Sequence, residues 1–198
     1  MKFSSDIDID LADRDSLLGL INVTPAAIRA AGVTKKHNTG VHPTAIPVDP
    51  VNGISALDYN LAEERGYVKI DLLNIWVYKH VKDEAHLLSL MRDPDWSKLQ
   101  DPDFFSRLIH IGKHYAVAQQ MPEPINSIPR LAMFLSIIRP GKRYLIGRSW
   151  SEVAKEIWVQ DPDGLYYFKK SHAVAYAHLV VVNMNLLVED PTAFSLLE

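Results

Sequence analysis

Apolar and polar residues alternate at the start of the chain. Ile7, Ile9 and Leu11 occupy every second position, and aspartates occupy the positions between them. A period of two is typical of a strand whose faces differ, so we predict a strand over residues 2–11. A short helix over residues 12–21 is predicted to follow it, because acidic residues lie in its first turn.

Two further early segments have recognisable patterns. Residues 24–32 carry helix signals, with Thr24 as the N-cap, Pro25 at the first helical position and Gly32 as the terminator. Residues 66–78 are rich in β-branched, aromatic and apolar side chains. This composition predicts a second strand that turns helical towards its end.

The later part of the chain has mainly helical spacing. Helical spacing begins near residue 84, and Asp-Pro-Asp interrupts it at 93–95 and at 101–103. Ser149 and Glu152 form a predicted capping box, and the apolar stretch 173–188 is interpreted as a buried helix or strand. Early strands and late helices predict an α+β fold that divides near residue 80.

Composition narrows the possible chemistry. The 198 residues are 47% hydrophobic with a net charge of -3, so nucleic-acid binding requires local basic clusters. Cysteine is absent, which leaves Asp, Glu and His as metal ligands. The acidic N-terminus lacks an apolar signal segment, and polar residues interrupt the stretch 173–188. We therefore expect a soluble, cytoplasmic protein without membrane partners.

The alternating aspartates are the first candidate site. Asp6, Asp8 and Asp10 share one face of the predicted strand, and Asp71 joins them if the two strands pair. Lys69 shares the face of Asp71. Carboxylates of this kind bind Mg²⁺ in phosphoryl transfer, where two ions can act together. The alternative is an exposed edge strand made acidic against aggregation, and Asp10 is equally suited to capping the next turn.

Basic segments are the second kind of candidate. Lys35, Lys36 and His37 lie beside a predicted glycine-containing turn and suit a phosphate backbone. The same chemistry recurs near Arg139 and in the segment 169–172. Each segment taken alone is equally compatible with a solvated basic surface.

Five motifs, taken in order, resemble the alpha subunit of bacterial DNA polymerase III, a C-family DNA polymerase. They are SDIDIDLADRDSLL at 5–18, TKKHNTGVHPTAIP at 34–47, GYVKIDLLNI at 66–75, IIRPG at 137–141 and FKKSHAVAYAHL at 168–179. The last is the most specific. The resemblance implies a small mixed palm-like sheet in residues 1–80 and a mainly helical, fingers-like region in residues 81–198.

The resemblance also implies roles for individual residues. Asp6, Asp8 and Asp71 match the metal-binding aspartates, which hold two Mg²⁺ ions or, alternatively, Mn²⁺. The remaining matches concern the substrates, a DNA primer–template and a deoxynucleoside triphosphate. Lys69 matches a residue near the triphosphate, Lys36 and His37 match the primer contact, and Arg139, Lys170, Ser171 and His172 match the fingers.

The chain departs from the family in ways that bear on activity. It is much shorter, and the Gly-Ser element expected before the aspartate strand to hold the triphosphate is not among these residues. The resemblance favours a nucleotidyltransferase, of the kind a phage encodes, over two alternatives. One is a non-catalytic module that binds nucleic acid or replisome proteins and retains the scaffold. The other is a structural protein.

Overall fold

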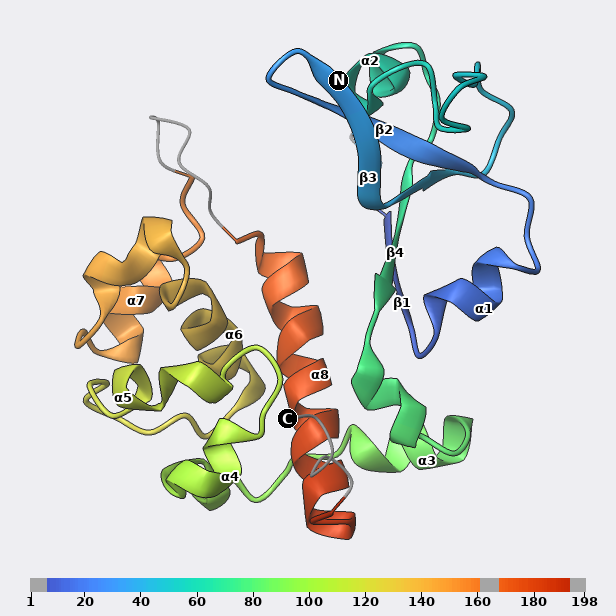
Figure 1. The fold of residues 1–198 in the computed structure, drawn as a ribbon. Helices are drawn as coiled ribbons and strands as arrows, with labels where there is room; N and C mark the ends of the chain where they lie inside the picture. The colour runs from blue at the N-terminus through green and yellow to red at the C-terminus, as the bar shows by residue number, and fades with distance from the viewer. Residues whose placement is uncertain (1–6, 161–167, 193–198) are drawn as a thin grey trace. The chain divides into compact units, whose positions relative to one another are not determined.

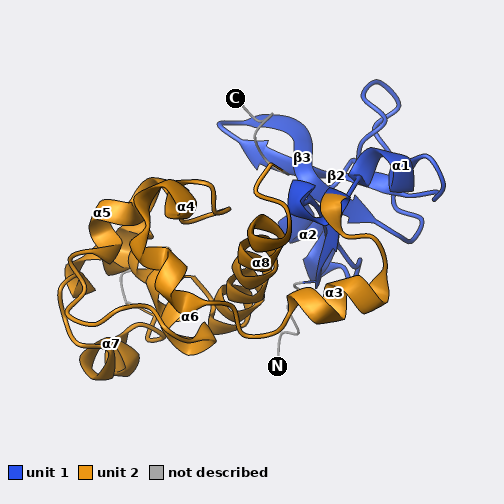
Figure 2. Ribbon diagram, turned by 90° about the horizontal axis from the view of Figure 1, so that it is seen from below, with its two compact units in different colours: residues 1–79 blue, residues 80–198 orange. Residues whose placement is uncertain are grey.

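The chain consists of two compact units. The computed structural model describes residues 7–160 and 168–192. Unit 1 comprises residues 1–79 and unit 2 residues 80–198, coloured blue and orange in Figure 2. Within the described ranges, one small mixed sheet forms in unit 1, and unit 2 is helical. The predicted α+β class is confirmed.

The sheet of unit 1 has four strands in the order β1-β4-β3-β2. Their bounds are Ile7–Leu11 for β1, Thr24–Ala30 for β2, Val33–His42 for β3 and Ile70–Asn74 for β4 (Figure 1). β1 runs parallel to β4, whereas β3 is antiparallel to both β4 and β2. The first strand is therefore held by a strand that comes some 60 positions later in the sequence.

The predicted helix over residues 24–32 is wrong, because these residues form β2. Ala31 and Gly32 have φ values of 50° and 79° and make the tight turn between β2 and β3. β2 lies at the edge of the sheet, where a strand tolerates Pro25. The basic segment 34–40 lies within β3, and Gly40, for which the sequence predicted a turn, is a strand residue paired with Asp71.

Short helices flank these strands. They are α1 at Arg14–Leu18, α2 at Tyr59–Glu64 and the 3₁₀ helix η1 at Trp76–His80. Asp13 and Asp58 cap α1 and α2 by accepting hydrogen bonds from backbone N–H groups. The second predicted strand is shorter than expected, because only Ile70–Asn74 pairs and η1 follows, as the helical end of that segment predicted.

Unit 2 is built from helices joined by short capped turns. They are α3 at Glu84–Leu90, η2 at Trp96–Gln100, α4 at Pro102–Ser106, η3 at Gly112–His114, α5 at Tyr115–Ala118, α6 at Ile128–Ile137, η4 at Pro140–Leu145, α7 at Trp150–Glu156 and α8 at Lys170–Glu189. Asp95 and Asp101 cap η2 and α4, which explains the predicted Asp-Pro-Asp breaks. Ser149 and Glu152 form the predicted capping box.

The core of unit 2 lies where α6 packs against α8. Phe134 and Leu131 of α6 and Val180 of α8 are fully buried. By length and composition, α8 could cross a bilayer, but 56% of its most apolar window is buried inside the protein. Burial on this scale is also typical of a core helix of a soluble protein.

Candidate functional site

Two aspartates lie opposite each other on the neighbouring strands β1 and β4. Asp8 of β1 lies directly opposite Asp71 of β4 in a parallel register. Neighbouring strands are about 4.8 Å apart, and paired residues direct their side chains to the same face. The pairing expected from the sequence is therefore present for these two residues. Asp6 lies outside the described residues.

The Asp71 carboxylate is held by side chains from two strands. Thr39 Oγ1 of β3 donates to Asp71 Oδ1 at 2.7 Å, and Lys69 Nζ donates to Asp71 Oδ2. The side chain of Asp71 is only 14% exposed. Charge-assisted hydrogen bonds in a half-buried setting fix the position of this acid more firmly than solvent contact does.

His37 lies beside the same carboxylate as a neutral imidazole. Its Nδ1 accepts hydrogen bonds from Gly40 N at 2.9 Å and Thr39 N at 3.3 Å, so the ring proton is on Nε2. Burial and the charge of Lys69 lower the pKa of His37. The 3.6 Å approach of Nδ1 to Asp71 Oδ1 is therefore a close contact between a neutral ring and a carboxylate, not an ion pair.

Gly40 allows this close arrangement. It pairs with Asp71 across β3 and β4. A Cβ at Gly40 would lie 3.0 Å from His37 Nδ1, 3.1 Å from Lys69 Cδ and 3.1 Å from Ala26 Cβ. The absence of a side chain here lets the imidazole and the lysine reach Asp71 together.

The aromatic ring of Tyr59 contacts both His37 and Lys69. Its ring lies 5.6 Å from the His37 ring in an edge contact, and Lys69 Nζ lies 5.6 Å from the Tyr59 centroid. A bridge between Ala27 and Asp58 brings the start of α2 to β2 and so positions Tyr59. Sequence reasoning missed Thr39 and Tyr59, and no spacing signal in the chain marks them.

The remaining candidates of unit 1 have lesser roles. Partial burial and the charge of Asp8 raise the pKa of Asp10, which pairs with Leu73 and not with an acid. Lys36 is solvent-exposed on β3, opposite Ala27 of β2. The structure thus brings Asp8, Asp71, Lys69 and His37 together and leaves Lys36 on the surface.

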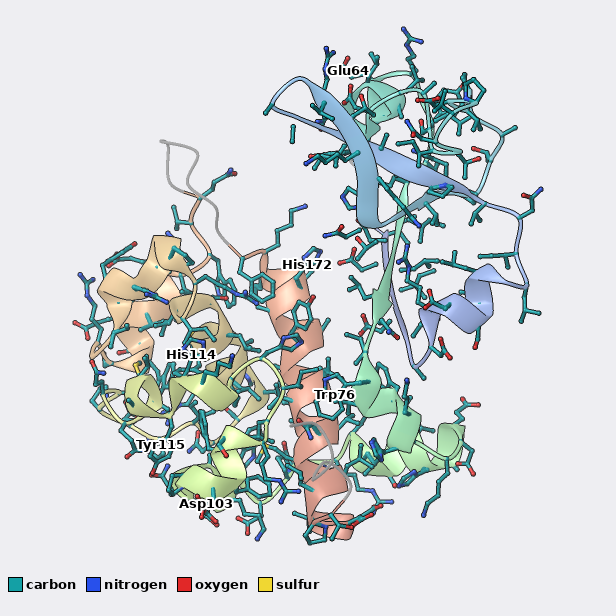
Figure 3. The ribbon with its side chains drawn as sticks, in the orientation of Figure 1. Glu64, Trp76, Asp103, His114, Tyr115 and His172 are labelled. Carbon is teal, nitrogen blue, oxygen red and sulfur yellow. The ribbon has the colours of Figure 1, made fainter. Side chains whose placement is uncertain are left out.

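A second cluster forms in unit 2 around an arginine. Arg139 follows α6, and its guanidinium carbon lies 4.8 Å from the centroid of Phe168. Phe168 stacks on Tyr176 of α8 at 5.3 Å and makes an edge contact with His172 at 6.2 Å. Figure 3 labels His172 in the first turn of α8. Two motifs some 30 positions apart are therefore neighbours in space.

Histidines add further nitrogen atoms to this cluster. The His110 ring lies 4.4 Å from Tyr176, and burial together with the charge of Arg139 lowers the pKa of His110 to about 4. Burial and the charges of Arg143 and Arg139 lower the pKa of His114, which Figure 3 also labels. Sequence reasoning missed both histidines. Lys170 and Ser171 are exposed at the start of α8.

Two nitrogen atoms of this cluster are buried without a hydrogen-bond partner in the described ranges, Arg139 Nε and His110 Nε2. Buried polar atoms of this kind are uncommon in folded proteins because each loses its hydration. The cationic and aromatic groups together form a surface that favours anionic, ring-containing ligands.

A cavity of about 430 Å³ lies elsewhere in unit 2. Trp96, Phe105, Gln119 and Pro124 contribute to its lining, which contains no charged side chain. None of the residues predicted from the sequence lines it.

Comparison with known proteins leaves the family open. No protein-family model, no curated protein and no solved structure matches the chain. The resemblance to the C-family polymerases stays a prediction that rests on the five sequence motifs.

Proposed function

We propose that this chain catalyses metal-dependent nucleotidyl transfer in the manner of the DNA polymerase III alpha subunit, adding nucleotides to a primer 3′ end. The observation that carries the proposal is the parallel register that places Asp8 opposite Asp71, with Lys69 bound to Asp71. Acidic alternation for solubility alone does not require a second acid at the paired position.

Asp8 and Asp71 suit a divalent cation in chemistry and number. Mg²⁺ is commonly bound by one or two carboxylates, with phosphate and water oxygens completing its shell. Mg²⁺ bound there would lower the barrier by stabilising negative charge on phosphate oxygens. Each oxygen of Asp71 already accepts one hydrogen bond, from Thr39 or from Lys69, and each keeps a second lone pair that could bind the ion.

Lys69 and Thr39 have positioning roles in this proposal. Thr39 fixes the rotamer of Asp71 through the 2.7 Å hydrogen bond. Lys69 is a largely buried cation whose Nζ lies over the ring of Tyr59. An ammonium group at this place is suited to contact a phosphate once the substrate competes for it with Asp71.

The cluster of unit 2 supports the nucleic-acid part of the proposal. Arg139, Phe168, His172 and Tyr176 combine a cation with aromatic rings. Proteins bind single-stranded bases and phosphates with this combination. Lys170 and Ser171 extend the same polar surface at the start of α8.

The test is primer extension with Mg²⁺ or Mn²⁺. We expect Asp8→Ala and Asp71→Ala to lower extension at least about a hundredfold, because positioned electrostatic groups contribute on that scale. Glu63→Gln, an exposed acid of α2, is the matched control and should keep the activity of the parent. Absence of extension in the parent protein with either metal would refute the proposal.

One observation favours a second candidate, a non-catalytic module that binds nucleic acid or replisome proteins. Among the residues that the structure describes, no group of three His, Asp or Glu side chains is arranged to hold a metal ion. This module would bind primer–template DNA without extending it. Equal binding by the parent, Asp8→Ala and Asp71→Ala, with no extension by any of them, would favour it.

A further inference from the structure

Arg14 begins α1 immediately after the acidic strand. Its backbone N donates to Asn74 Oδ1 of β4 at 3.4 Å, and the preceding residue, Asp13, caps the helix. The backbone of Arg14 is thus attached to the end of β4. Its charge is close enough to His37 to contribute to the lowered pKa of that imidazole. Arg14 therefore belongs to the surroundings of the carboxylate pair.

The guanidinium of Arg14 is buried in part, and two of its three nitrogen atoms lack a hydrogen-bond partner among the residues that the structure describes. Nε and Nη2 are both shielded from solvent, and neither has a partner among the described residues. A charged N–H group removed from water without an acceptor costs more free energy than a neutral group does. The backbone contacts of Arg14 do not require this charge, so folding alone does not account for it.

Lys69, unlike Arg14, has a hydrogen-bond acceptor for its charged group among the described residues. Lys69 donates to Asp71 and lies over Tyr59, so its charge is satisfied inside the protein. The Nε2–H of His37 is a further donor, because Nδ1 is occupied as an acceptor. A guanidinium with free donors beside further N–H groups is suited to a tetrahedral oxyanion, which it can contact through two parallel hydrogen bonds.

We propose that Arg14 binds a phosphate of a polyphosphate ligand, pyrophosphate or the tail of a nucleoside triphosphate, in unit 1. The identity of the anion rests on the proposed function, whereas the need for an anion rests on the guanidinium itself. Arg14 is then a ligand-binding residue whose unpartnered nitrogen atoms destabilise the free protein and gain their acceptors on binding.

Calorimetric titration with pyrophosphate in millimolar Mg²⁺ tests the inference. We expect Arg14→Met to weaken binding about tenfold to a hundredfold, the range that hydrogen bonds to charged groups provide. Arg14→Lys should recover part of the affinity, because it restores the charge without the planar donors. The same change at an exposed arginine of β2, Arg29→Met, is the matched control and should bind as the parent does.

A thermal unfolding measurement without ligand separates binding from folding. Removal of an unpartnered buried cation should leave the melting temperature of Arg14→Met equal to or above that of the parent. A large fall would identify a structural arginine and overturn the inference. So would absence of pyrophosphate binding by the parent, or equal affinity in the parent and Arg14→Met.

Failure of the proposed function is distinguishable from failure of this inference. Arg14-dependent pyrophosphate binding without primer extension would retain the anion site and refute the polymerase activity. Primer extension that Arg14→Met leaves unchanged would retain the activity and refute the role of Arg14.

Discussion

The Asp71 cluster of unit 1 and the Arg139 cluster of unit 2 place charge in different ways. In unit 1 the acid Asp71 is neutralised within the protein by Lys69 and Thr39. In unit 2 the cation Arg139 contacts an aromatic ring, and the charges that shift the pKa of His110 and His114 are all positive. The buried charge of Asp71 thus has its partners within the protein, whereas neighbouring cations repel one another unless an anion lies among them.

The Asp71 cluster is therefore already assembled without a ligand, whereas the Arg139 cluster has the composition of a surface that binds one. In unit 1, hydrogen bonds from Thr39 and Lys69 hold the Asp71 carboxylate in place before any ligand binds. In unit 2, Arg139 Nε and His110 Nε2 are buried and have no hydrogen-bond acceptor among the residues that the structure describes. Substitutions next to Asp71, such as Gly40→Ala, should therefore lower the free energy of unfolding, because they disturb contacts that the protein already makes.

The largest effect is expected at Phe168, where the cluster depends on the core. Phe168 is 3% exposed and supports both Arg139 and Tyr176. Phe168→Ala should lower the free energy of unfolding by about 3–5 kcal/mol, the usual cost of deleting a buried aromatic side chain. Denaturant unfolding measures it, with the less buried Phe104→Ala as control. Similar small losses for both would contradict the central role of Phe168.

Gly40 should have the next largest effect. Gly40→Ala forces a Cβ against His37, Lys69 and Ala26, and overpacking of this kind costs about 1–3 kcal/mol. Gly19→Ala is the control, because its Cβ would meet only ordinary contacts at 3.5 Å and 3.7 Å. The same denaturant measurement applies to both. Equal stability of Gly40→Ala and the parent would show that unit 1 adjusts freely.

A smaller effect concerns acid stability through His110. Burial and Arg139 lower the pKa of this imidazole from 6.5 to about 4. Between those values the unfolded chain binds a proton that the folded protein does not, so stability falls as the pH decreases from 6.5 to 4. Since His110 is partly exposed, we expect a loss of about 1–2 kcal/mol, less than the full shift gives.

His110→Asn tests this effect, because asparagine tolerates the positive φ of 65° and does not titrate. Denaturant unfolding measured at several pH values should give the variant a flatter pH profile over this window. Parallel profiles for the variant and the parent would contradict the assignment. Loss of the contact with Tyr176 would lower the stability of the variant equally at every pH, so it does not affect the comparison of the two pH slopes.

The smallest effect is expected at Lys36. This side chain is exposed, so Lys36→Ala should change the free energy of unfolding by less than about 0.5 kcal/mol. If Lys36 contacts a phosphate backbone, the variant should weaken primer–template binding a few-fold and reduce the salt slope by about 1. Lys79→Ala, another exposed lysine, is the control. An unchanged slope would remove Lys36 from the interface.

Local signals predicted some elements well. The alternation at Ile7–Leu11, the acidic first turn of α1 and the capping box of α7 depend on neighbouring residues, and all three are present. The helix predicted over residues 24–32 failed because Thr24, Pro25 and Gly32 also suit an edge strand and its turn. Pairing with β3 selects the strand over the helix, and the residues within 24–32 do not by themselves indicate that pairing.

The sequence predicted which residue types form the candidate site but not how they are arranged in space. Aspartates on two strands and Lys69 beside one of them were visible in the sequence. The parallel register of Asp8 and Asp71, and the approach of Thr39 and Tyr59, depend on tertiary pairing. His110 was missed because its chemistry comes from burial against α8 and not from its neighbours in the chain.

The parallel pairing of β1 with β4 also has a kinetic consequence. The β2–β3 hairpin can form from adjacent residues, whereas β1 must wait until β4 is available, across a loop of about 60 residues. Contacts with such a large sequence separation form slowly. The carboxylate pair therefore belongs to the late, high-contact-order part of folding, and a growing chain acquires its acidic site only after residue 71 has emerged.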